Sequence, residues 1–140
     1  MSIETNKALA RRVIEEIYNL DRYDVADEII SPHYLSHNSG IDQVVGAEGV
    51  KNAARRQRAT FPDLHTRIDD LIAEGDRVVL RARDRMTHVN AFMGYAPTGR
   101  TFEMTWMQIV RIEDGKLVES WWEMDIELFR KHLSGEVLRY

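Results

Sequence analysis

The spacing of the apolar residues changes once along the chain, at His65. Before it, apolar residues recur every three or four positions, as on one face of a helix; after it, they alternate with polar residues, as in strands with one buried face. Helices followed by a run of strands are the order of an α+β domain, in which the helices cover one face of an antiparallel sheet. Such a sheet can curve into a cone around an interior apolar pocket, the usual form of a small-molecule site.

The first part of the chain predicts three helices. The first spans about residues 4–20, with Leu9, Val13 and Ile17 on its apolar stripe, and the second spans residues 24–30 and stops near Pro32. The third spans residues 46–60. A fourth helix is expected after the strands, over about residues 125–133.

The second part predicts four strands in hairpins. They cover residues 65–73, 77–89, 101–112 and a last run that ends at Met124, with turns at Gly75 and at Asp114-Gly115. Alternation places one set of side chains on the inner face of the sheet. The set consists of Val78, Leu80, Ala82, Asp84, Met86, His88, Phe102, Met104, Trp106, Gln108, Val110, Ile112, Val118, Ser120, Trp122 and Met124.

Length and composition fit one globular domain over residues 1–140, since the chain is 44% apolar and 30% charged. The net charge of −4 gives no basic field of the kind that nucleic acids attract. No apolar run approaches the ~20 residues of a membrane span, and the N-terminus lacks the apolar core of a signal peptide. We therefore expect a cytoplasmic protein with neither nucleic acid nor membrane as a partner.

The chemistry of the side chains narrows the possible sites. The chain has no cysteine, which excludes disulfides, thiolate metal sites and a cysteine nucleophile. The five histidines are scattered, and no His, Asp and Glu residues stand at compact metal-ligand spacing, so we expect no metal.

A set of short motifs in a fixed order carries a family resemblance. In chain order the motifs are Tyr34-x-x-His37-Asn38, Gly46-x-Glu48-Gly49, Phe61-Pro62-Asp63-Leu64, Thr87-His88, Phe92-x-Gly94, Pro97-Thr98-Gly99-Arg100 and Asp114-Gly115-Lys116. Together they resemble the SnoaL-like polyketide cyclases over nearly the whole chain. The resemblance implies the cone of nuclear transport factor 2, a homodimer formed through the outer face of the sheet, and aldol chemistry on a small hydrophobic compound without a cofactor. The same cone also hosts isomerases, dehydratases and binding domains, so the fold alone does not choose the reaction.

The expected catalytic pair of that family is missing. By spacing from Asp114-Gly115-Lys116, the cyclase histidine falls at Gln108 and the cyclase aspartate falls at Trp122, and neither residue can shuttle a proton. If the alignment with the family is shifted by three residues, the position of the cyclase aspartate falls at Asp125, which could then take the acid/base role. Because Asp125 directly precedes the apolar run of a predicted helix, it is also a candidate for the N-cap, and the pattern favours this role.

His88 and Asp84 are the other candidate acid/base residues. The resemblance carries over the Thr-His pair at His88, and parity places both side chains on the inner face. They lie about 13 Å apart along one strand, so they form no direct dyad. Burial of Asp84 in an apolar pocket would raise its pKa toward the range used in proton transfer, whereas a paired Asp84 would be structural.

The remaining candidates would bind substrate. The resemblance places His37, together with Tyr34, at the cavity wall, although His37 could instead hydrogen-bond a loop carbonyl. The other wall residues are Met86, Met104, Trp106, Gln108, Trp122 and Met124, each of which could also be simple core packing. Two functions follow: an enzyme of the cyclase, isomerase or lyase type that uses His88 with Asp84 or Asp125, or a domain that only binds a small hydrophobic ligand.

Overall fold

The protein is described from a computed structural model, which covers residues 2–38 and 43–136. Its first half contains α1 (Ile3–Arg12), the π-helix η1 (Val13–Tyr18), α2 (Val25–Ile29), β1 (Ile30–Asn38) and α3 (Gly46–Thr60). Its second half contains β2 (His65–Glu74), β3 (Arg77–Thr87), β4 (Thr101–Glu113), β5 (Lys116–Met124) and α4 (Ile126–Ser134). The predicted α+β class is confirmed.

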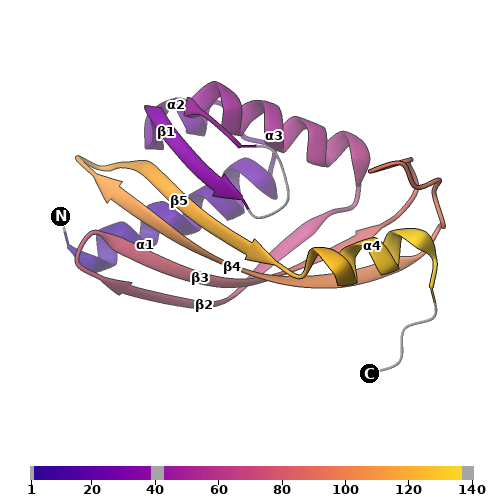
Figure 1. Ribbon diagram of the computed structural model, residues 1–140. Coiled ribbons are helices and arrows are strands. Elements are labelled where there is room, and N and C mark those ends of the chain that lie inside the picture. The colour runs from indigo at the N-terminus through magenta and orange to yellow at the C-terminus, as the bar shows by residue number, and fades with distance from the viewer. Residues whose placement is uncertain (1, 39–42, 137–140) are drawn as a thin grey trace.

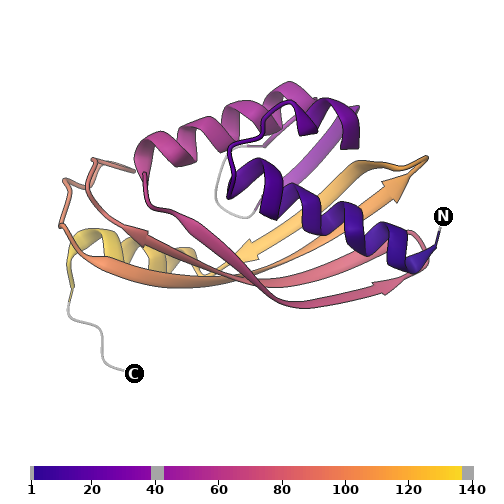
Figure 2. The same ribbon diagram turned by 180° about the vertical axis from the view of Figure 1, so that it is seen from behind.

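The five strands form one curved sheet in the order β1-β5-β4-β3-β2. All neighbours are antiparallel except β1 and β5, which are parallel. Helices α1, α2 and α3 lie over the concave face, and α4 lies at the end opposite the chain's N-terminus (Figures 1 and 2). The parallel strand β1 was not predicted, since the sequence indicated no strand between the helix expected at residues 24–30 and the helix expected at residues 46–60.

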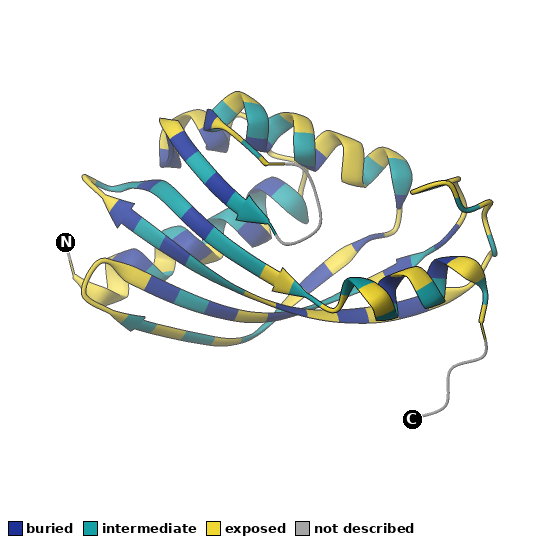
Figure 3. Cartoon of the chain, in the orientation of Figure 1, coloured by how far each residue is buried: buried dark blue, intermediate teal, exposed yellow. Residues whose placement is uncertain are grey.

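The core fills the space between the helices and the sheet. Buried residues alternate along the strands and form a stripe on each helix (Figure 3). Ile14 and Ile17 of η1 and Val50 of α3 pack toward Leu80 and Val110 of the sheet in one apolar cluster. The expected first helix therefore exists, but its second half is a π-helix and ends at Tyr18 rather than Leu20.

A bulge in the last hairpin corrects one predicted orientation. Asp114 and Gly115 have φ of 51° and 75°, the left-handed values of a tight hairpin turn, as predicted. Beyond the turn, Arg111 pairs with Glu119 while Ile112 pairs with Leu117, which leaves Val118 as the extra residue. Leu117 is consequently the buried residue, and the prediction that Val118 faces inward is wrong.

A second apolar cluster lies at the end of the sheet that α4 covers. Phe129 and Leu133 of α4 pack there with Phe61, Met86 and Met104. The connection between β3 and β4 folds over the same end. It is tied to the end of α3 by Asn90, whose side-chain amide donates to the carbonyls of Ala59 and Thr60.

Among the described residues, no helix has both the length and the hydropathy to cross a membrane.

Candidate functional site

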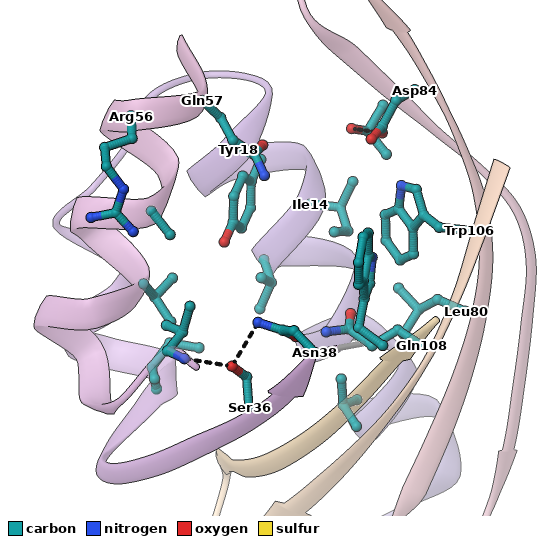
Figure 4. A pocket seen from close by; sticks show the side chains of 18 of the residues that line it. Ile14, Tyr18, Ser36, Asn38, Arg56, Gln57, Leu80, Asp84, Trp106 and Gln108 are labelled. Atoms are coloured by element: carbon teal, nitrogen blue, oxygen red, sulfur yellow. Dashed lines mark hydrogen bonds between the residues drawn. The ribbon is translucent and has the colours of Figure 1, made fainter. Parts of the chain in front are cut away.

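A cavity of about 630 Å³ lies between the helices and the concave face of the sheet (Figure 4). This is the size of a site for a small organic molecule of two or three rings. Apolar side chains make up most of its wall. The polar side chains that line it are those of Tyr18, Tyr34, Ser36, Asn38, Arg56, Gln57, Thr60, Thr66, Asp84, Trp106, Gln108 and Trp122.

The cavity has a closed apolar end and an open end. Four buried residues line its closed part: Ala10 at the end of α1, Ile14 of η1, and Val110 and Leu117 of the hairpin formed by β4 and β5. The exposed lining residues are Arg56, Gln57, Ala59 and Met93, which come from the last turns of α3 and from the β3–β4 connection. A ligand would therefore enter beside the C-terminal end of α3 and place its apolar part deep in the cone.

Asp84 lies in the wall of this cavity, at the centre of a row of three side chains on adjacent strands. Thr66 pairs directly with Asp84 between β2 and β3, and its hydroxyl donates to Asp84 Oδ1 over 2.6 Å. Trp106 lies diagonally opposite on β4, where Ala82 is its direct partner, and its side chain also hydrogen-bonds Asp84. The row fixes the carboxyl group and leaves it facing the cavity.

Burial is the main influence on the charge of Asp84. Desolvation raises the pKa of the carboxyl above its ordinary value of 3.8, and the hydrogen bonds from Thr66 and Trp106 partly offset that rise because they favour the charged form. An aspartate whose pKa is moved toward neutrality can take and return a proton under mild conditions.

Tyr18 faces the same cavity and was missed by the sequence analysis. Burial is the largest cause of its raised pKa, and the charge of Asp84 adds to that rise, so its hydroxyl remains a proton donor. The hydroxyl has no hydrogen-bond partner within the described part of the chain. Tyr18 stands four positions after Ile14, so the helical spacing places both on the same buried face. The sequence pattern was interpreted only as core packing, which is why Tyr18 was not predicted as a cavity residue.

Gln108 and Trp122 face the cavity as predicted and pair directly across β4 and β5. Tyr34 also lines it, with its hydroxyl hydrogen-bonded to Ser120 Oγ over 2.5 Å. Trp122 lines the cavity without filling it, since a volume of about 630 Å³ remains. The positions of the missing cyclase pair therefore provide an amide and an indole for ligand contact.

His88 lies outside the cavity wall. It is fully buried behind Phe61, whose ring centroid is 6.4 Å from that of the imidazole. The main-chain N–H of Thr98 donates to His88 Nδ1 over 3.3 Å, and the Thr98 hydroxyl lies 3.2 Å from the same atom. Nε2 has no partner in the described residues. His88 follows the end of β3, beyond the part of the strand that lines the cavity. Its contact with Thr98 helps to hold the β3–β4 connection in place.

Asp125 is the N-cap of α4. Its carboxylate accepts from the N–H of Leu128 over 2.9 Å, and the residue is exposed and outside the cavity lining. The N-cap alternative is therefore confirmed as the structural role of this residue.

Asp125→Ala is expected to lower the free energy of unfolding by about 1 kcal/mol, the usual cost of losing such a cap. Chemical denaturation would measure the loss, and Asp125→Ser, which can cap equally well, is the matched control. Normal stability of Asp125→Ala combined with lost activity would instead favour the catalytic role.

Four of the expected binding residues lie elsewhere. His37 faces the outer side of the sheet, where it hydrogen-bonds Glu119 over 2.8 Å and stacks on Trp121, so its placement at the cavity wall was wrong. The pairing of the strands explains this orientation. His37 of β1 lies opposite Trp121, which faces the outer side, whereas Asn38 lies opposite the inward Trp122. Met86 and Met104 are buried in the second apolar cluster, and Met124 packs between the two clusters without lining the cavity.

No group of three or more His, Asp or Glu side chains in residues 2–38 and 43–136 is arranged to hold a metal ion.

Comparison with known proteins agrees with this geometry. Residues 8–129 match the sequence model of the SnoaL-like polyketide cyclases. No curated protein matched the chain. Among solved structures, IdmH from Streptomyces antibioticus, for which polyketide cyclase activity is proposed, is 31% identical, with a TM-score of 0.75 over 87% of this chain and 93% of that chain.

Two further structures are similar over almost the full length. TsrD from Streptomyces laurentii is 29% identical, with a TM-score of 0.83 over 98% of this chain and 99% of that chain. AclR from Streptomyces galilaeus, a proposed hydroxylase, is 27% identical, with a TM-score of 0.83 over 99% of this chain and 87% of that chain. Together with the extent of the family match, these similarities confirm the resemblance carried by the motifs: the chain belongs to the SnoaL-like polyketide cyclase family.

Proposed function

We propose that the protein is a cofactor-independent enzyme that moves a proton at the carbon beside a carbonyl group of a small hydrophobic compound, as a cyclase, isomerase or lyase does. The observation that carries the proposal is Asp84, the single carboxylate among the described residues that line the cavity. Its raised pKa and its fixed position suit a general base that later acts as the acid.

In this mechanism the carboxylate of Asp84 removes the proton from the carbon next to the substrate carbonyl. The electron pair of the broken C–H bond moves to the carbonyl oxygen, where hydrogen bonds from Tyr18 and Gln108 would stabilise the enolate. Thr66 and Trp106 hold the carboxyl group during the transfer.

The second half of the reaction returns the proton. In a cyclase, the enolate carbon forms a bond with a second carbonyl carbon of the same molecule, and the resulting alkoxide takes the proton from the Asp84 carboxyl. In an isomerase, a different carbon of the enolate takes it. Both routes restore the Asp84 carboxylate and need no oxidant or reductant.

Exchange of hydrogen for deuterium tests the proposal directly. β-Tetralone is a bicyclic ketone with acidic protons beside its carbonyl, and it fits the dimensions of the cavity. We expect the protein in D₂O to accelerate deuterium incorporation at that carbon, measured by NMR. Binding of the ketone without acceleration would instead support a domain that only holds its ligand.

The exchange rate should depend on pH in one direction. Because the base form of Asp84 is required, the rate should fall as the pH drops through the Asp84 pKa, at a higher pH than for an ordinary aspartate. Thr66→Val removes a hydrogen bond that favours the carboxylate, so the midpoint of the profile should move to higher pH. A midpoint that stays unchanged in Thr66→Val would contradict Asp84 as the titrating group.

The homodimer implied by the family resemblance stays a prediction. Ile72 and Met107 are 63% and 51% exposed, and such a contact through the outer face of the sheet would cover them.

A further inference from the structure

The cavity wall carries one positive charge that the proposed proton transfer does not use. Arg56 is the single basic side chain among the described lining residues, just as Asp84 is the single acidic one. They come from opposite walls, Arg56 from α3 and Asp84 from β3 (Figure 4). The cavity is therefore polarised, with a cation at its open end and a carboxyl group further along the sheet.

Arg56 has no ion-pair partner in the described part of the chain, although its neighbours on α3 are engaged. The guanidinium of Arg55 lies 4.9 Å from the ring centre of Tyr23. Arg58 pairs with Asp21 over 3.1 Å and donates to main-chain carbonyls, including that of Leu64. Arg56 alone of the three lines the cavity, so its five N–H groups remain available to a ligand.

Two other hydrogen-bond donors line the cavity together with this cation. The Tyr18 hydroxyl has no partner among the described residues, and the charge of Arg56 acts on it by lowering its pKa against the larger effect of burial. Gln57, the next residue on α3, also lines the open end. A cation, a phenol and an amide facing one space offer several hydrogen-bond donors to an acceptor that the protein itself does not supply.

We propose that the substrate carries a carboxylate that binds Arg56 at the open end of the cavity, while the reacting carbonyl lies deeper, at Asp84. A planar guanidinium matches the two oxygens of a carboxylate. A phosphate dianion fits less well, because Arg56 lies near the C-terminal end of α3, where the helix dipole disfavours additional negative charge. This inference rests on the proposed function and adds the substrate class, an amphipathic keto acid.

A matched pair of ligands tests the inference. One is β-tetralone with a carboxylate on its aromatic ring, and the other is the neutral methyl ester of the same compound. Quenching of Trp106 and Trp122, which both line the cavity, reports binding. Loss of one charge-assisted contact at an exposed rim costs roughly tenfold in affinity, so Arg56→Gln should weaken the acid by about that factor and leave the ester unchanged.

Arg55→Gln is the control, since it removes the same charge from the adjacent position outside the cavity. It should leave both affinities unchanged. The inference is overturned if the wild-type protein binds the acid no better than the ester, or if Arg56→Gln weakens both ligands equally. It is also overturned if Arg55→Gln weakens the acid as much as Arg56→Gln does.

Failure of this inference can be told apart from failure of the proposed function. If Arg56 proves indifferent to the carboxylate while the protein still accelerates deuterium exchange into the ester, the proton transfer stands and only the substrate class is wrong. If neither ligand undergoes exchange but Arg56→Gln selectively weakens the acid, the carboxylate site stands without the catalysis.

Discussion

Asp84→Asn is expected to reduce the rate of deuterium exchange by about 10²–10⁴-fold, the usual contribution of a positioned general base. An asparagine has nearly the shape of an aspartate and can still accept the hydrogen bond from Thr66, but it cannot take a proton. Ligand affinity should therefore change little. Rate measurements by NMR and affinity measurements by tryptophan fluorescence would separate the two effects.

The same variant should be more stable than the wild-type protein at neutral pH. The pKa of Asp84 is higher in the folded state than in the unfolded chain, so folding favours the protonated carboxyl. Its contribution to stability is fully present below the unfolded pKa and is lost as the pH rises through the folded pKa. The asparagine of the variant never becomes charged, so its advantage should appear near neutral pH and vanish below the ordinary aspartate pKa of 3.8.

Asp70→Asn provides the control for both measurements. Asp70 lies on β2 but is exposed, and it pairs with Arg81 over 2.6 Å outside the cavity. The change should leave the exchange rate unaltered. An Asp84→Asn variant that keeps the wild-type rate would remove Asp84 from the mechanism, whatever its stability.

Periodicity was sufficient to predict the inner face of β3 and β4. The two strands pair without interruption from Arg77 with Arg111 to Thr87 with Thr101, so the alternation holds along their whole length. Alternation alone therefore placed Asp84, Trp106 and Gln108 correctly on the concave face. The bulge at Val118 shows the limit of this argument, because one extra residue reverses the parity beyond it.

Periodicity could not show how far along the cone each inward residue lies. His88 and Met86 share the face of Asp84, but α4 and the β3–β4 connection cover that end of the sheet and separate these residues from the cavity. The closure depends on contacts between segments distant in sequence. Local sequence patterns such as alternation and turn motifs do not contain information about such contacts.

The strand β1 was missed for a related reason. Its residues include Pro32 and several polar side chains, and its pairing partner β5 lies about eighty positions later in the chain. A parallel partner at such a distance leaves no local pattern to read. The orientation of His37 depended on that pairing, so its predicted place in the wall could not be corrected from the sequence.

His88→Ala is expected to lower the free energy of unfolding by about 2 kcal/mol while leaving the exchange rate of the folded protein within a few-fold of wild type. Removal of a buried ring leaves a void beside Phe61 and deprives the Thr98 N–H of its acceptor. Part of that cost is offset, because Nε2 of His88 is a buried polar atom without a hydrogen-bond partner in the described residues and disappears with the ring.

His88→Asn is the matched variant, since its side-chain oxygen can lie near the position of Nδ1 and accept from Thr98. It should recover part of the lost stability, and chemical denaturation of both variants would show the difference. The opposite result is equally clear: if His88→Ala unfolds normally but loses the exchange activity as completely as Asp84→Asn, His88 reaches the substrate. The catalytic role predicted for it from the sequence would then stand, and Phe61 would have to move aside to expose the imidazole.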